Sequence, residues 1–140
     1  MEIGADMSRF ATAAHLASWA GMCPGQNESA GKRKSGRTQQ GSRWLRTALV
    51  QAAYAAGRKK GTYLWALYRK LAGRLGPQKA AVAVGHAILV MVYHLIQDGT
   101  EYQDLGPNYF DERNKEATVR RSVKRIENLG YEVTLHPKAA

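Results

Sequence analysis

The chain has 140 residues, and its 21 Lys or Arg outnumber its 11 Asp or Glu, which gives a net charge of +10 at pH 7. Its length suits one domain with an ordinary core, and a content of 44% hydrophobic and 23% charged residues excludes disorder along the whole chain. The positive charge indicates an anionic partner, usually nucleic acid and less often a membrane surface. The single cysteine, Cys23, excludes an internal disulfide and favours a reducing cytoplasm.

Helical spacing of the apolar residues predicts a mainly α protein, a small domain of four to five helices with a long basic loop. The expected helices cover residues 8–19, 42–56, 62–75, 77–98 and 111–129. Residues 131–135 alternate like a short edge strand or a tail. We expect one domain over residues 1–105, followed by a charged helix and a tail over residues 106–140.

The fourth helix is apolar almost all round, which predicts a place at the centre of the bundle. Its apolar run over residues 80–96 is interrupted by Gly85, His86 and His94. We therefore interpret it as the core helix of a soluble protein and not as a membrane span. The two histidines are eight residues apart and are expected to be core or edge residues, not zinc ligands.

Residues 21–41 contain five Gly and one Pro but almost no apolar side chain, which predicts a long loop. Loops of this length inside compact domains are usually functional or disordered. Two chemistries fit its serines and cations. In the first, Ser29 and Ser35 donate hydrogen bonds to a phosphate that the cations neutralise. In the second, one serine is a nucleophile that attacks a phosphodiester while arginines stabilise the developing charge. Spacing alone does not choose between them.

An acid-free window begins at the same loop. From Ser29 to Gln97 the sequence runs 69 residues without an Asp or Glu and carries 13 Lys or Arg. Such a surface attracts nucleic acids, whose affinity comes mainly from phosphate contacts. The predicted DNA-binding residues are Lys32, Arg33, Lys34, Arg37, Arg43, Arg46, Arg58, Lys59 and Lys60. For the last three, a solvated turn is the alternative.

Several motifs in fixed order carry a resemblance to a known family. They are Phe10-x-Thr12-Ala13-x-His15-Leu16-Ala17-Ser18-Trp19-Ala20-Gly21, Cys23-Pro24-Gly25, Glu28-Ser29-Ala30-Gly31-Lys32-Arg33 and Gly41-Ser42-Arg43-Trp44-Leu45-Arg46, with a later run from Lys79 through Tyr93, His94 and the Tyr102 region. Together they resemble the C-terminal domain of the insertion-sequence transposases whose N-terminal half is a RuvC-like nuclease with a DEDD acidic set. That family is also described as bridge-RNA-guided recombinases.

The resemblance implies DNA transposition, with Ser29 as the nucleophile that forms a covalent phosphoserine link to DNA and Ser35 as the second choice. Lys32, Arg33 and Arg37 would neutralise the scissile phosphate, and Arg43 and Arg46 would flank it. The implied partners are DNA, a guide RNA and further copies of the full-length protein. The implied location is the bacterial cytoplasm, in association with DNA.

The family's full protein is several times longer, and its nuclease acids, with a divalent metal such as Mg²⁺, lie in the N-terminal half. Glu2, Asp6 and Glu28 form no two-metal carboxylate cluster on any defensible spacing. We therefore expect a truncated copy with no metal site or cofactor of its own. The alternatives are a non-catalytic basic module that binds DNA or RNA, and an inactive transposase remnant.

Three further groups of residues allow two interpretations each. Trp19, Trp44 and Trp65 match helix faces and are expected to anchor the core, although Trp44 at a helix start could instead reach a nucleic-acid base. His15 either packs or orients a phosphate or serine. Four cations of the last helix either contact nucleic acid or pair with its acids, namely Arg120, Arg121, Lys124 and Arg125.

Overall fold

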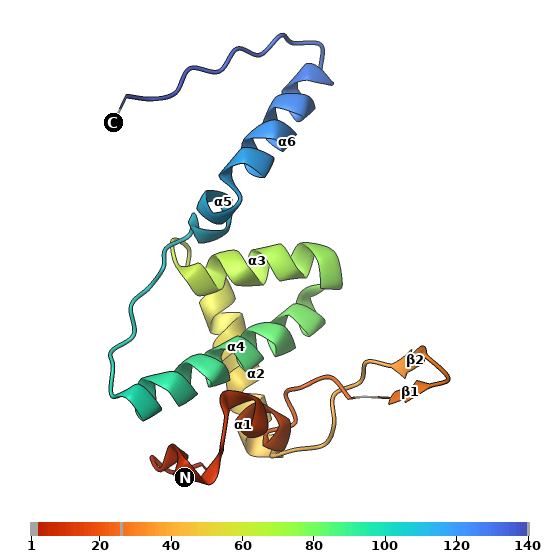
Figure 1. Ribbon diagram of the computed structural model, residues 1–140, viewed down its shortest axis with the longest axis vertical. Helices are drawn as coiled ribbons and strands as arrows, with labels where there is room; N and C mark the ends of the chain where they lie inside the picture. Colours follow the sequence, from red (N-terminus) through yellow and green to blue (C-terminus); the bar gives the residue numbers. More distant parts are fainter. Residues whose placement is uncertain (1–2, 26, 140) are drawn as a thin grey trace. The chain divides into compact units, whose positions relative to one another are not determined.

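The computed structural model describes residues 3–25 and 27–139, and the chain divides into two units, Met1–Pro107 and Asn108–Ala140. The prediction of a mainly α protein is confirmed (Figure 1). The first unit holds η1 (Met7–Arg9), α1 (Ala13–Trp19), β1 (Asn27–Ser29), β2 (Lys32–Ser35), α2 (Arg43–Arg58), α3 (Tyr63–Leu75) and α4 (Pro77–Asp98). The second unit holds α5 (Tyr109–Arg113) and α6 (Lys115–Glu127).

The first predicted helix is divided. Phe10 and Thr12 have extended backbone between η1 and α1, and the Thr12 side chain accepts a hydrogen bond from the His15 amide at 3.2 Å. The hydroxyl of Tyr93 on α4 donates to the Phe10 carbonyl at 3.0 Å. A continuous helix over residues 8–19 is therefore wrong, because a threonine cap and a tertiary hydrogen bond hold this segment extended.

Helix α4 is the centre of the first unit, as predicted. It packs against α1, α2 and α3, and it buries Val84, Leu89 and Tyr93. A Cβ at Gly85 would lie 2.9 Å from the Met22 Cε and 3.2 Å from the Leu49 carbonyl oxygen, so glycine allows α2 to pass close to α4. By length and composition alone α4 could cross a membrane, but its packing is that of a core helix.

The starts of two helices follow from the sequence. Ser42 caps α2 by accepting from the Leu45 amide at 3.2 Å, and Pro77 occupies the first turn of α4, where no amide donor is required. Helices α2 and α3 are in contact where Gly57 faces the ring of Tyr68. A Cβ on Gly57 would lie 2.7 Å from the Tyr68 Cδ1 atom. Small residues thus set the closest contacts between helices in this unit.

The second unit departs from the expected single helix over residues 111–129. The backbone of Asn114 has φ −124° and ψ 40°, which separates α5 from α6. Residues 131–139 form no strand among the described residues, so the tail, and not the edge strand, is the alternative that the structure supports.

Candidate nucleic-acid interface

The segment between α1 and α2, expected to be a loop, contains a β-hairpin that extends away from the helices of the first unit (Figure 1). Strands β1 and β2 pair antiparallel, with Ser29 directly opposite Lys32. Ala30 (φ 51°) and Gly31 (φ 73°) form the two-residue turn, and positive φ at both positions is the hairpin geometry that matches strand twist. Sequence reasoning missed these strands because Gly-rich polar segments lack an alternating apolar pattern.

The register brings the preferred serine and a cation together at the tip. Residues directly opposite on an antiparallel pair have side chains on one face, with Cβ atoms about 4.5–5.5 Å apart. Ser29 and Lys32 are both exposed, and a Cβ on Gly31 would meet nothing within 4 Å. The tip is therefore accessible from solvent and presents a hydroxyl beside an ammonium group.

Ser35 has a different environment at the base of the hairpin. It is half-buried, and its Oγ accepts a hydrogen bond from the Arg37 amide at 3.1 Å. This short-range bond shapes the chain where β2 ends. The two serines that the sequence could not separate thus differ in exposure and in hydrogen bonding.

Arg46 anchors the stem of the hairpin to the first turn of α2. Its Nη1 donates to the Thr38 Oγ1 at 2.6 Å and to the Gly21 carbonyl at 3.2 Å. The stem itself closes through a bridge between Pro24 and Thr38 and through a 2.9 Å bond from the Gly25 amide to the Arg37 carbonyl. Arg46 was predicted to bind DNA; in the structure Nη1 faces inward, and the DNA contact stays a prediction.

The predicted DNA-binding residues form two groups and not one. Lys32, Arg37 and Arg43 are exposed on the hairpin side, whereas Arg58, Lys59 and Lys60 are exposed at the far end of α2. At 1.5 Å per residue, Arg43 and Arg58 are about 22 Å apart along the helix axis. Arg33 and Lys34 belong to β2, but their side chains lie outside what the structure describes.

Residues 1–69, just under half of the chain, match the family model described as Transposase IS116/IS110/IS902 family. The match supports an IS110-family transposase. No curated protein and no solved structure gives a significant match. The matched residues cover the hairpin, its stem, α2 and the first half of α3, so all candidate serines and DNA-binding residues lie within the segment that is similar to the transposases.

The transposase-like segment has no visible metal centre. Among residues 3–25 and 27–139, no group of three or more His, Cys, Asp or Glu could hold a metal ion. His15 is exposed on α1, His86 is half-buried on α4 and His94 is exposed beside the ring of Tyr93.

A polar anchor that sequence reasoning did not find lies beyond the matched segment. The Asp104 carboxylate accepts from the Tyr63 amide at 2.9 Å, the Gly106 amide at 2.7 Å and the Tyr102 hydroxyl at 3.0 Å. The bond from the Tyr63 amide is the main reason that the pKa of Asp104 lies below its usual value. Burial, followed by the bond to Asp104, raises the pKa of Tyr102 to about 12. These contacts attach the connector after α4 to the start of α3.

The three tryptophans differ in their exposure to solvent. Trp44 is 79% exposed, so the expectation that it anchors the core is wrong. Trp19 is 45% exposed, and its ring centre lies 5.6 Å from that of Phe10. Trp65 is half-buried, and the guanidinium carbon of Arg69 lies 5.9 Å from its ring centre. Trp44 is the second residue of α2, and its side chain lies on a different side of the helix from the buried Leu49. The helical spacing of apolar residues in the sequence does not show which of them face solvent.

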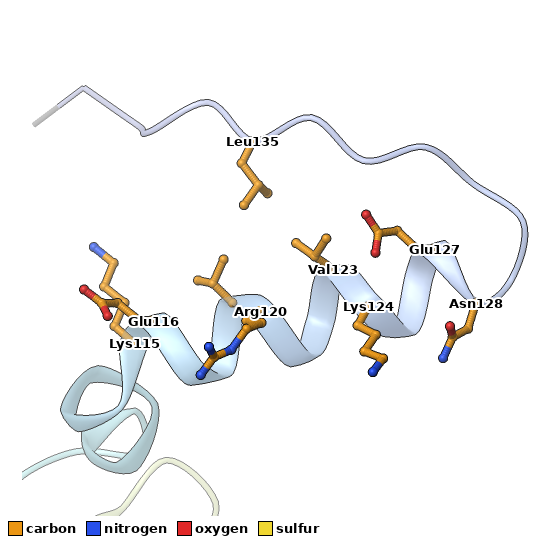
Figure 2. A pocket seen from close by; sticks show the side chains of 9 residues that line it. Lys115, Glu116, Arg120, Val123, Lys124, Glu127, Asn128 and Leu135 are labelled. Carbon is orange, nitrogen blue, oxygen red and sulfur yellow. The ribbon is translucent and has the colours of Figure 1, made fainter.

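The second unit contains an open groove between α6 and the tail (Figure 2). Figure 2 shows Leu135 of the tail pointing toward the α6 side that carries Val123, with charged side chains along the helix. Arg121 donates to the Ala117 carbonyl at 3.1 Å, and no ion pair involves the four α6 cations among the residues described. The residues that line the groove lie beyond the matched segment in the sequence.

Proposed function

We propose that this chain acts in DNA transposition as a serine-bearing transposase module, with Ser29 as the nucleophile. The observation that carries the proposal is the placement of Ser29 at an exposed hairpin tip directly opposite Lys32, inside the transposase-like segment. Ser35 fits less well, because the residue is half-buried and its Oγ already accepts from the Arg37 amide. An exposed hydroxyl beside a cation can approach a phosphodiester that the same cation helps to neutralise.

The proposed step exchanges one phosphate ester for another. The Ser29 Oγ attacks the phosphorus and loses its proton to solvent. The bond between phosphorus and a sugar oxygen breaks, and that oxygen takes up a proton from solvent and leaves as a hydroxyl. Attack of a different sugar hydroxyl on the phosphoserine reverses the exchange and joins the new strand. Because each step replaces one phosphate ester by another, strand exchange needs no external energy source.

The basic residues are proposed to hold the DNA during this exchange. Lys32 would contact a phosphate near the tip, with Arg33 and Lys34 on the same β strand. Arg37 in the stem and Arg43 at the start of α2 would continue this surface. Arg58, Lys59 and Lys60 lie about 22 Å farther along the axis of α2 and would contact a second part of the duplex. A guide RNA and further copies of the chain are the additional partners proposed from the family resemblance, and a divalent metal would belong to a nuclease domain.

The test is the covalent adduct. The transposase is incubated with a transposon-end duplex that carries a bridging phosphorothiolate, whose sulfur leaves readily and traps the phosphoserine, and adducts are counted on denaturing gels. We expect Ser29→Ala to abolish the adduct and leave DNA affinity within about twofold, while Ser35→Ala retains it. An adduct that persists in Ser29→Ala and disappears in Ser35→Ala overturns the assignment.

A simpler function, non-catalytic binding of DNA or RNA, is supported by the exposure of both cation groups. For this function, Ser29→Ala would have no effect on any step. Affinity for duplex DNA would still fall with salt, with a slope of about 0.9 in log affinity per phosphate neutralised. Wild-type protein that shows this salt dependence but forms no adduct under any condition would favour the binding module.

A further inference from the structure

An uncovered aromatic surface lies beside the hairpin stem. Trp44 is 79% exposed, and the residues that follow it one turn later on α2, Thr47 and Ala48, are small and also exposed. A single exposed apolar residue is common on protein surfaces and indicates nothing alone. Here the preceding residue is the exposed Arg43, and the first acidic residue on either side in the sequence is Glu28 before Trp44 and Asp98 after it.

The backbone that carries Trp44 is fixed relative to the hairpin stem. Ser42 caps α2 two residues before Trp44, and Leu49 is buried on another side of the helix. Two residues after Trp44, Arg46 bonds to Thr38 of the hairpin stem. Six residues separate Lys32 from Thr38, so at 3.3 Å per residue the stem spans at most about 20 Å from the tip to this bond. The stem therefore limits the distance between Ser29 and the backbone of Trp44.

We propose that Trp44 is a stacking platform for an unpaired DNA base, with Arg43 contacting an adjacent phosphate. Stacking on an aromatic ring accepts any base, and a surrounding cationic surface supplies the backbone contacts that single-stranded DNA requires. An acid-free basic surface disfavours a basic protein partner and complements a polyanion. The proposal rests on the proposed function, because it places the unpaired base on the same strand that the hairpin holds.

The geometry restricts which DNA can use this site. A base inside an intact duplex has both faces covered by its neighbours, so only an unpaired or displaced base can stack on the indole. The upper limit of about 20 Å on the stem corresponds to on the order of six stacked nucleotides at 3.4 Å each. We therefore expect Trp44 to favour DNA that is unpaired within about six nucleotides of the phosphate that Ser29 attacks.

The experiment measures the affinity of the full chain for three labelled DNAs by fluorescence anisotropy: a single strand, a duplex with a short gap, and the intact duplex. We expect Trp44→Ala to weaken binding of the first two by about 5- to 100-fold, as the loss of one stacked base predicts, and to change binding of the intact duplex by less than about twofold. Trp44→Phe should recover most of the affinity. Tyr131→Ala, which removes an aromatic ring that is 68% exposed in the second unit, is the matched control and should bind like wild type.

Three results would overturn the inference: single-strand affinity unchanged in Trp44→Ala, a Trp44-dependent preference for single-stranded RNA over DNA, or a DNA-independent change in sedimentation that assigns Trp44 to a contact between protein chains. None of these touches the Ser29 adduct, which tests the proposed function separately. Wild-type protein that binds no DNA of any kind would overturn both. Because Trp44 is exposed, thermal unfolding of Trp44→Ala should match wild type, and this measurement confirms that the variant folds.

Discussion

Gly21 and Gly41 meet backbone to backbone where the hairpin segment leaves α1 and enters α2. A Cβ on Gly21 would lie 2.6 Å from the Gly41 nitrogen and 2.8 Å from the Gln39 carbonyl oxygen. Gly21 also has a φ of 69°, a conformation that L side chains rarely adopt. The two glycines therefore define the crossing point from which the hairpin extends, and they explain why a Gly-rich segment yields a fixed stem.

Gly41→Ala should destabilise the first unit by about 1–3 kcal/mol, because the new methyl group meets backbone atoms that cannot move aside. Urea unfolding followed by circular dichroism measures the change. Gly73→Ala is the matched control: it lies on the exposed side of α3 with nothing within 4 Å of its Cβ. This control should stabilise the helix by up to about 1 kcal/mol, and equal destabilisation by both substitutions would contradict the crossing.

Arg46→Met should loosen the stem while α2 stays folded. The substitution removes the bonds to the Gly21 carbonyl and the Thr38 hydroxyl but keeps a long apolar side chain. Hydrogen bonds from charged groups each contribute about 1.5–3 kcal/mol, so amide exchange at Gly25 should accelerate at least tenfold. Arg43→Met changes an exposed residue at the start of α2 and should leave this exchange rate unchanged. If the two variants exchange alike, Arg46 does not hold the stem.

Ala30→Gly should stabilise the hairpin. Ala30 is the one non-glycine residue with positive φ in the described part of the chain, and a left-handed conformation costs an L residue roughly 1–2 kcal/mol. Glycine relieves that strain but costs about 0.5–1 kcal/mol in conformational entropy, which leaves a net gain of up to about 1 kcal/mol. The rate of amide hydrogen exchange at Lys32 measures this gain, because a more stable hairpin exchanges more slowly. Gly31→Ala, at φ 73°, should have the opposite sign, and a gain from both changes would rule out this turn geometry.

The Asp104 anchor makes stability depend on pH at both extremes. Because the pKa of Asp104 is lower in the folded state than its usual 3.8, this carboxylate adds stability above that value, and the contribution is lost as the pH falls through the folded pKa. Because the pKa of Tyr102 rises from 10.0 to about 12 on folding, its contribution is complete below pH 10 and is lost as the pH rises toward 12.

Asp104→Asn should therefore lower stability at pH 7 and flatten the acid limb of the stability curve measured by urea unfolding. Tyr102→Phe should remove one tyrosine that ionises near pH 12 from the ultraviolet titration. Glu101→Gln removes an exposed charge from the same connector without touching the Asp104 hydrogen bonds, and it should leave both measurements unchanged. An acid limb that is identical in wild type and Asp104→Asn would show that the anchor does not form.

Several elements followed from local patterns. The helix starts near residues 42 and 77 and the central position of α4 were predicted correctly, because caps, proline and all-round apolarity act within a few residues. The division of the first helix was not predictable, since it depends on the Tyr93 hydroxyl reaching Phe10, 83 positions away. The hairpin was missed because its strands carry charge instead of an alternating apolar face.

The sequence by itself determined that this chain is mainly helical, basic over a 69-residue acid-free window, and equipped with two serines among cations. These properties depend on composition and on neighbours along the chain. Only the tertiary structure decided that Ser29 lies at an exposed tip opposite Lys32, that the Ser35 hydroxyl accepts from Arg37, that Nη1 of Arg46 faces the stem and that Trp44 faces solvent. Strand register, backbone crossings at glycine and long-range hydrogen bonds set these positions, and residue spacing does not encode them.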